Sequence, residues 1–241
     1  MKMTSARRAA GVLVVLAACA AAAACSGSSG DAPAQVESTP PAVSPANSPP
    51  AAQGERPRVV CLGDSLTAGL GLASTDQAYP ALLERRLETA GFDYQVINAG
   101  VSGDTSAGGL RRLDWSLQGD VRVLIVALGA NDGLRGLPPS ELHSNLETIV
   151  TTAQKRQVRV LLLGMEAPPN FGAAYTRDFR AVYRQVAADR DVPLVPFFLE
   201  GVAGVGKLNQ ADGIHPTEEG QRQIADTIWR SLEPIVRSQT S

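Results

Sequence analysis

The stretch Val59-Val60-Cys61-Leu62-Gly63-Asp64-Ser65-Leu66 decides the fold of this chain. An apolar run that ends in Gly-Asp-Ser is typical of a buried strand that turns sharply into a helix. The pattern places Ser65 at the start of that helix, where unpaired backbone N–H groups stabilise a developing negative charge. A hydroxyl in this position is suited to nucleophilic chemistry if a base lies within reach. Cys61, inside the strand, is interpreted as a core residue.

The base that such a serine needs is found near the end of the chain. Only two histidines occur, His143 and His215. Asp212 precedes His215 by three residues, so its carboxylate can bend back within one turn and orient the imidazole. His143 lies near the start of a predicted helix with no carboxylate placed to orient it, and is interpreted as a surface residue. Ser65, Asp212 and His215 are therefore the candidate catalytic residues of a nucleophilic hydrolase.

Apolar runs and helical patterns alternate along the chain after residue 58. Strands are predicted over 58–62, 94–98, 121–128, 159–164 and 193–196, and helices over 79–90, 106–117, 139–156, 173–188 and 217–237. Continuous Val, Leu and Ile strands separated by helices predict a parallel sheet that is covered on both faces. We therefore expect an α/β fold, a flavodoxin-like three-layer αβα sandwich with a five-stranded parallel sheet.

Polar motifs follow four of the predicted strands. They are Ser65 after the first strand, Gly103 after the second, Asn131 after the third, and Asp212 with His215 after the fifth. Because the carboxyl ends of parallel strands meet at one edge of a sheet, these groups are expected to lie together. Each motif alone is also explained by ordinary turn and capping chemistry. Their joint occurrence favours a functional site.

Taken in order, four blocks carry a resemblance to a known family: Gly63-Asp64-Ser65-Leu66, Gly103, Gly129-x-Asn131-Asp132 and Asp212-x-x-His215. They resemble the blocks of the SGNH (GDSL) hydrolase superfamily, from about residue 59 to the C-terminal helix. The resemblance implies an arylesterase, acyl thioesterase or lysophospholipase that forms an acyl-enzyme on Ser65. It also implies an oxyanion hole made by the backbone N–H groups of Ser65 and Gly103 and the side-chain amide of Asn131.

The same resemblance marks residues 165–172 as a loop that contacts the acyl group. The substrate-binding residues that it implies are Ala167, Pro168, Asn170 and Phe171. The expected substrate is a small acyl ester, a thioester or a lysophospholipid. Two further readings stay open: a carbohydrate O-deacetylase that uses the same triad, and an anchored binding module with an inactive site. The filled triad positions argue against the binding module.

Composition excludes several other classes of function. Two separated histidines without a cysteine pair give no metal-ligand cluster, so no metal and no organic cofactor are expected. Gly69-Leu70-Gly71 lacks the remaining glycine and the acidic residue of a dinucleotide-binding loop. The net charge of −2, without a basic block, makes nucleic acid an unsuitable partner.

The first 57 residues differ in composition from the rest. Arg7 and Arg8 precede the apolar stretch 9–24, so residues 1–25 are predicted to be a signal peptide of the lipoprotein type, lipidated at Cys19 or Cys25. Plain signal cleavage without a lipid is the alternative. Residues 26–57, rich in Ser, Pro and Ala, are predicted to be a disordered tether, and 58–241 the hydrolase domain. We expect an exported monomer, anchored to the cell membrane or released into the periplasm or medium.

Overall fold

The computed structural model describes residues 56–239. The predicted signal peptide, with Cys19 and Cys25, and nearly all of the predicted tether lie outside the described residues. Within 56–239, no helix combines the length and the apolar character that crossing a membrane requires.

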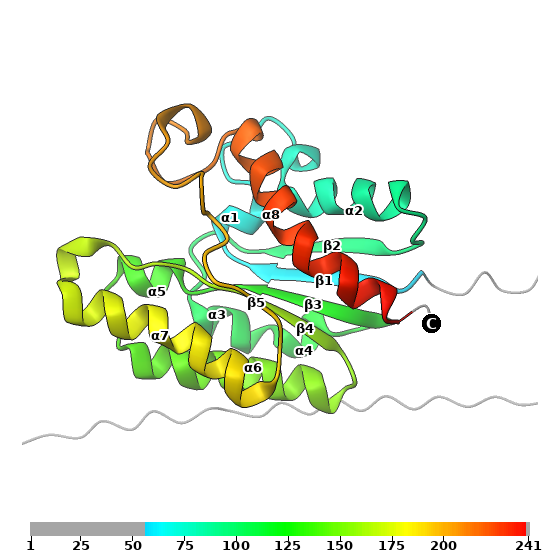
Figure 1. Ribbon diagram of the computed structural model, residues 1–241, viewed down its shortest axis with the longest axis horizontal. Helices are drawn as coiled ribbons and strands as arrows, with labels where there is room; N and C mark the ends of the chain where they lie inside the picture. Colours follow the sequence, from blue (N-terminus) through cyan, green and yellow to red (C-terminus); the bar gives the residue numbers. More distant parts are fainter. Residues whose placement is uncertain (1–55, 240–241) are drawn as a thin grey trace, which may run out of the picture. The chain divides into compact units, whose positions relative to one another are not determined.

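Five parallel strands form one sheet in the order β2-β1-β3-β4-β5, which confirms the predicted α/β fold (Figure 1). The strands are β1 (Arg58–Gly63), β2 (Gln95–Gly100), β3 (Val121–Ala127), β4 (Arg159–Leu163) and β5 (Leu194–Val195). The strand that precedes the candidate serine, β1, lies between β2 and β3 and pairs with both along its whole length. At its last residue, Gly63 stands opposite Gly100 on one side and Ala127 on the other.

The fifth strand is shorter than the four residues predicted. Only Leu194 and Val195 pair with β4. Pro193 and Pro196 flank these two residues, and a proline has no N–H group to donate to a sheet. The prolines therefore confine the strand to the residues between them.

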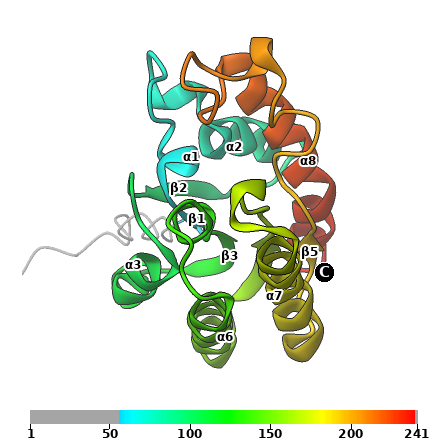
Figure 2. The ribbon, with the colours of Figure 1, turned by 90° about the vertical axis from the view of Figure 1, so that its left-hand side faces the viewer.

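Helices cover both faces of the sheet, as Figure 2 shows end-on. One face carries α2 (Tyr79–Thr89) and α8 (Glu218–Arg237), and the other carries α3 (Ser106–Arg111), α6 (Pro139–Lys155), α7 (Ala173–Arg190) and the short α4 (Leu113–Ser116), which is labelled in Figure 1. Two short helices follow strands directly, α1 (Ser65–Ala68) after β1 and α5 (Ala130–Leu134) after β3. Single 3₁₀ turns occur at η1 (Thr75–Gln77), η2 (Pro169–Phe171) and η3 (Gly206–Leu208).

The single helix predicted over 106–117 is wrong. The structure has two helices there, α3 and α4, separated at Arg112, whose backbone (φ −107°, ψ 9°) departs from helical geometry. The Arg112 side chain reaches three oxygen atoms on other segments, which include the ends of β1 and β2. The local helical pattern is thus overridden by contacts that are distant in sequence.

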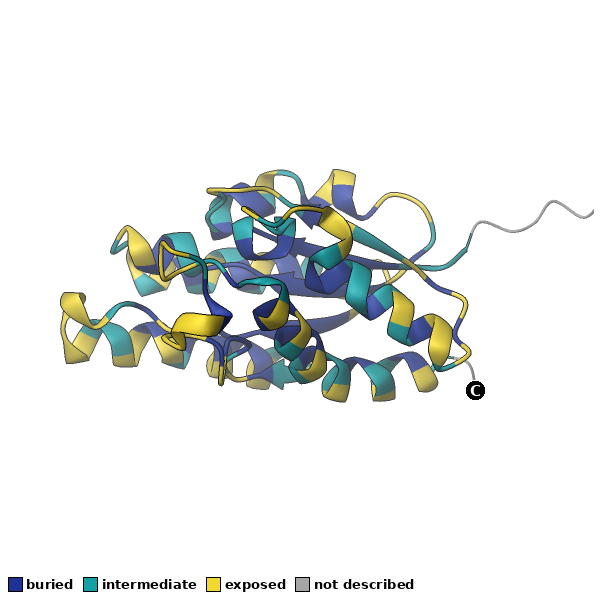
Figure 3. Cartoon of the chain, turned by 90° about the horizontal axis from the view of Figure 1, so that it is seen from above, coloured by how far each residue is buried: buried dark blue, intermediate teal, exposed yellow. Residues whose placement is uncertain are grey.

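The core lies between the sheet and its two helical layers. Figure 3 shows buried strands and helices that expose only their outer sides. Residues Val59 to Leu62 of β1 are at most 1% exposed. Cys61 is fully buried among them, which confirms its interpretation as a core residue, and burial raises the pKa of its thiol well above the usual range.

All five strands end at the same edge of the sheet, on the left in Figure 1 and facing the reader in Figure 2. The described chain starts and finishes at the opposite edge. There Arg58 donates its backbone N–H to Asp120, just before β3, and the Gln239 side chain donates to the carbonyl of Arg122. The loops that carry the predicted site residues therefore lie far from both ends of the described chain.

Candidate active site

Ser65 occupies the first position of α1, two residues after β1 ends. Asp64 caps the helix, because its carboxylate accepts the backbone N–H of Leu66 at 3.0 Å. The turn is tight: a Cβ atom on Gly63 would lie only 1.9 Å from the Thr67 hydroxyl. A glycine is therefore required at the end of β1, and the half-buried Ser65 is held at the carboxyl edge of the sheet.

His215 and Asp212 are brought to Ser65 as the sequence predicted. The Ser65 Oγ lies 2.9 Å from His215 Nε2, and His215 Nδ1 lies 2.6 Å from Asp212 Oδ2. The other carboxylate oxygen, Asp212 Oδ1, accepts the backbone N–H groups of Ile214 and His215 at 2.9 and 3.0 Å. The imidazole and these two N–H groups hold the pKa of the Asp212 carboxyl well below its usual range.

The loop with these two residues is closed by its own backbone. Asn209 pairs with Pro216 in an isolated antiparallel bridge, and the Gln210 N–H donates to the His215 carbonyl at 2.7 Å. The Gln210 side chain reaches the Leu70 carbonyl at 2.8 Å, which connects the loop to the segment after α1. Sequence reasoning assigned no role to Asn209 or Gln210, because amides of this kind give no local signal.

Gly103 and Asn131 lie on the loops that follow β2 and β3. Gly103 has φ +84°, which L side chains rarely adopt, and its carbonyl accepts a hydrogen bond from Arg135 at 2.8 Å. Asn131 lies in α5, and its Nδ2 donates to the Asp104 carbonyl at 2.9 Å. A longer contact of 3.4 Å joins the same Nδ2 to the Asp64 carboxylate.

A model of the GDSL-like lipase/acylhydrolase family matches residues 61–223, a span that contains every residue of this arrangement. The chain belongs to this family. The prediction of a carboxylic ester hydrolase of the GDSL type is thereby confirmed.

Relatives of this GDSL-like hydrolase agree with the assignment. The chain is 48% identical over 179 residues to the esterase TesA of Pseudomonas aeruginosa, covering 74% of this chain and 89% of the relative. It is 40% identical over 179 residues to thioesterase 1/protease 1/lysophospholipase L1 of Escherichia coli strain K12, covering 74% and 84%. A crystal structure of TesA superposes with a TM-score of 0.71 at 46% identity, covering 74% of this chain and 99% of that one.

A buried polar cluster supports the loop with Asn131 in this GDSL-like hydrolase. The carboxylate of Asp132, 2% exposed, accepts the backbone N–H of Ser106 at 2.8 Å and the Ser106 hydroxyl at 2.6 Å. Asn145 of α6 donates to the same hydroxyl at 2.9 Å. Helices α3, α5 and α6 are thereby tied together directly behind the site, a connection that the sequence did not reveal.

Asp64 is a buried acid beside the candidate catalytic residues. Asp64 is only 1% exposed to solvent, and this burial raises the pKa of its carboxyl to about 6. The Leu66 N–H and the nearby His215 act in the opposite direction, and neither offsets the loss of solvation. The carboxyl of Asp64 thus takes up a proton at a higher pH than an exposed aspartate does.

The loop predicted to contact the acyl group lies beside α5. Ala167 is buried, and a Cβ atom on Gly133 would lie 3.3 Å from its methyl group. Pro168 is half-buried, whereas Asn170 and Phe171 are exposed. The Phe171 ring packs against the Tyr175 ring, with the two centroids 5.2 Å apart and the planes tilted by 48°, and it also lies against Gly136. Among the four predicted binding residues, Asn170 and Phe171 are therefore the ones open to solvent.

His143 is not part of the arrangement. It lies on α6, and its Nδ1 is 3.9 Å from a carboxylate oxygen of Glu147 on the same helix. A carboxylate is thus closer than expected, although the distance is too long for a hydrogen bond. Among residues 56–239, no three histidine, cysteine, aspartate or glutamate side chains gather as a metal site would require.

Proposed function

We propose that this protein is a serine esterase that cleaves carboxylic esters or thioesters through an acyl-enzyme on Ser65. The observation that carries the proposal is the hydrogen-bonded line from the Ser65 hydroxyl through His215 to Asp212, with distances of 2.9 and 2.6 Å. The names of the relatives, esterase and thioesterase, support the same chemistry.

In the acylation step, His215 Nε2 accepts the hydroxyl proton while Ser65 Oγ bonds to the substrate carbonyl carbon. The electron pair of the C=O bond moves to the oxygen, which becomes an oxyanion. Collapse of this intermediate breaks the bond to the leaving alcohol or thiol, which receives the proton from the imidazolium. Asp212 keeps Nδ1 of His215 protonated and stabilises the imidazolium that forms. The lowered pKa of its carboxyl keeps Asp212 ionised for this role.

The oxyanion is stabilised by the N–H groups of Ser65 and Gly103 and by the Asn131 amide. One hydrogen of that amide is held by the Asp104 carbonyl at 2.9 Å. The other points toward Asp64 at 3.4 Å, a weak contact that an oxyanion can replace. The amide is thus oriented before the substrate arrives, which is the condition for electrostatic stabilisation of the transition state.

Water completes the cycle. His215 removes a proton from the water as it attacks the acyl carbon, and the second oxyanion collapses to release the carboxylic acid and Ser65. Phe171, which is 40% exposed, gives the adjoining loop an apolar surface for an acyl chain. Short acyl esters, acyl thioesters and lysophospholipids are the proposed substrates, cleaved by a monomer without a cofactor.

The test is a panel of 4-nitrophenyl esters and acyl-coenzyme A thioesters of increasing chain length. Wild type and Ser65→Ala are compared, with Ser102→Ala as a control because that serine is exposed and adjoins Gly103. We expect hydrolysis by wild type and by Ser102→Ala, and none by Ser65→Ala. Turnover that persists without Ser65 would remove the covalent mechanism. Activity confined to acetyl esters would favour the O-deacetylase.

The acyl-enzyme is tested separately with a fluorophosphonate, which reacts with activated serines. Mass spectrometry of the digested protein should find one phosphonylated peptide, the one with Ser65. His215→Ala should slow the labelling strongly, whereas His143→Ala should not. Labelling at another serine at the same rate would contradict the proposal.

Export and lipid anchoring are part of the same proposal. The N-terminal sequence supports them through Arg7, Arg8 and the apolar stretch that follows. Mass spectrometry of the mature N-terminus, extracted from cell membranes, distinguishes lipidated Cys19 from lipidated Cys25. An unmodified N-terminus in the soluble fraction would indicate plain secretion.

A further inference from the structure

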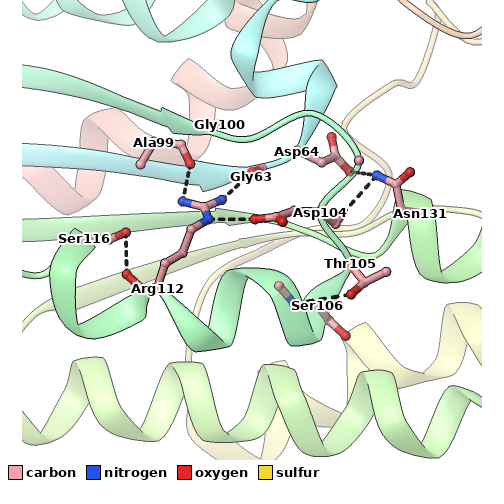
Figure 4. Close-up of polar contacts among 12 residues, drawn as sticks. Gly63, Asp64, Ala99, Gly100, Asp104, Thr105, Ser106, Arg112, Ser116 and Asn131 are labelled. Atoms are coloured by element: carbon pink, nitrogen blue, oxygen red, sulfur yellow. Dashed lines mark hydrogen bonds and ion pairs between the residues drawn. The ribbon is translucent and has the colours of Figure 1, made fainter.

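Arg112 makes an unusual set of contacts next to the proposed active site. It lies at the break between α3 and α4, and its side chain is 18% exposed. The guanidinium donates to the carbonyl oxygens of Ala99 and Gly63 and to the carboxylate of Asp104, each at 2.7 Å (Figure 4). Three different nitrogen atoms are used, one for each acceptor.

Each acceptor belongs to a segment that carries a proposed oxyanion donor. Gly63 ends β1, two residues before Ser65, and Ala99 lies at the end of β2, four residues before Gly103. Asp104 directly follows Gly103, and its backbone carbonyl accepts the Asn131 amide. One guanidinium therefore contacts the segments of Ser65 and Gly103 directly and the segment of Asn131 through Asp104, whose contacts with Arg112 and Asn131 are drawn in Figure 4.

We propose that Arg112 is a positioning residue that fixes the three oxyanion donors of the esterase relative to one another. This inference rests on the proposed function of Ser65. Arg112 itself touches no reacting atom. It acts through the strand ends and through Asp104, and its effect is expected on the transition state, where the donors must converge on one oxygen.

The chemistry of the side chain suits this role. A guanidinium presents its N–H groups in a rigid planar fork, whereas the lysine ammonium is a single point on a flexible stem. The pair with Asp104 is charge-assisted, and both side chains are only 18% exposed, so solvent screens it weakly. The strand ends are also confined from the other side, because a Cβ atom on Gly100 would lie 2.3 Å from the backbone nitrogen of Ala68 in α1.

The experiment compares Arg112→Lys and Arg112→Gln with wild type on 4-nitrophenyl butyrate. Arg111→Gln is the matched control, since Arg111 is the exposed neighbour on α3. We expect kcat to fall ~10–100-fold in both Arg112 variants, because displacements of about 1 Å cost up to ~10²-fold in rate. KM should stay within about threefold, and the control should match wild type.

A second readout separates positioning from general damage. An alkyl trifluoromethyl ketone adds reversibly to an active serine and places an anionic oxygen where the oxyanion forms. Its inhibition constant should rise by the same factor by which kcat/KM falls, as expected for a transition-state analogue. When Arg112→Lys is added to Asn131→Ala, kcat/KM should fall by a smaller factor than when Arg112→Lys is made alone, because one of the three donors that Arg112 positions is then already missing.

Four results would overturn the proposal: full activity in Arg112→Lys, a loss confined to KM, unchanged affinity for the ketone, or effects that multiply fully with Asn131→Ala. Circular dichroism and thermal unfolding are measured on each variant. If Arg112→Gln does not fold, Arg112→Lys decides, and if neither folds, Arg112 is a requirement of the fold and the proposal is wrong. Ser65→Ala, run in parallel, distinguishes this from a failure of the proposed function, because its activity would then persist.

Discussion

Ser65 and His215 face each other from segments that differ in construction. Ser65 follows a strand that is paired on both sides and buried, and the capping acid Asp64 is 1% exposed. His215 and Asp212 lie on a loop without regular secondary structure, and the side chain of Asp212 is 45% exposed. The proposed nucleophile is thus positioned by the core, whereas the proposed base and its orienting acid depend on a few hydrogen bonds at the surface.

The difference shows how the site divides its tasks. A change near Ser65 must disturb the packing of the sheet and is expected to affect the stability of the whole domain. A change in the loop can alter the position of the imidazole while the sheet stays intact. Stability and activity should therefore separate cleanly between the two regions.

Asp212→Asn should give the largest effect. The amide can no longer hold His215 in the tautomer that accepts the serine proton, and in serine hydrolases this change costs ~10⁴-fold in kcat. The midpoint of thermal unfolding should stay within about 2 °C, because the loop is exposed. The measurement is steady-state hydrolysis of an aryl ester together with calorimetry. Asp114→Asn, which changes an exposed carboxylate of α4, serves as the control. A large loss of stability in Asp212→Asn would contradict the comparison.

Asp64→Asn tests the buried side of the site through its pH dependence. Because the folded pKa of Asp64, about 6, lies above its value of 3.8 outside the fold, the folded protein keeps a proton that the unfolded chain releases. Stability should fall as pH rises from about 4 to 6 and stay lower above that range. A shift of this size corresponds to about 3 kcal/mol. Asparagine carries no charge and so removes the cost of burying a carboxylate. The free energy of unfolding in urea should therefore rise for the variant, relative to wild type, between pH 4 and pH 7. If the difference in the free energy of unfolding between the variant and wild type does not change with pH, the raised pKa of Asp64 is refuted.

Gly100→Ala should destabilise the domain by ~1–3 kcal/mol, since the added methyl group meets the backbone of α1 at 2.3 Å. For a domain of this size, each kcal/mol lowers the unfolding midpoint by roughly 2–4 °C. Gly206→Ala is the control, because a Cβ atom there meets nothing within 4 Å. Equal midpoints for the two variants would show that the strand end is looser than its packing indicates.

Gly213→Ala should give the smallest effect, and one confined to activity. Gly213 has φ +72° with open space around it, so alanine is strained there by its backbone alone, at a cost of ~1–2 kcal/mol. The strain falls on the exposed loop with His215, which can relieve most of it by a local shift. We therefore expect kcat/KM to drop a few-fold while the unfolding midpoint moves by only about 1 °C or less, below the full cost of the strain. Gly204→Ala carries the same strain (φ +76°) in another loop and should leave kcat/KM unchanged. A drop of the same size in both variants would mean that the loop around Gly213 has no special role.

Features with a local cause could be predicted from the sequence. The strand and the turn into Ser65 follow from eight consecutive residues, and the pairing of Asp212 with His215 follows from a spacing of three. Their convergence required one further step, namely that parallel strands end at a common edge. The order of the strands in the sheet was not needed for that step.

What sequence reasoning missed depends on partners that are distant along the chain. Arg112 reaches Gly63 across 49 positions and Asp132 reaches Ser106 across 26, and no periodicity reports such contacts. The break in the predicted helix 106–117 has the same origin. The shortened fifth strand is different, because Pro193 and Pro196 were visible and their missing N–H groups could have predicted it.

The placement of both ends of the described chain has a practical consequence. Arg58 and Gln239 lie at the edge of the sheet opposite to Ser65. A carrier protein or a solid support joined at either end would therefore sit behind the reacting edge and leave the approach of an ester unobstructed. Immobilised preparations of this domain should accordingly turn over small and bulky acyl compounds with the same relative preference as the free enzyme.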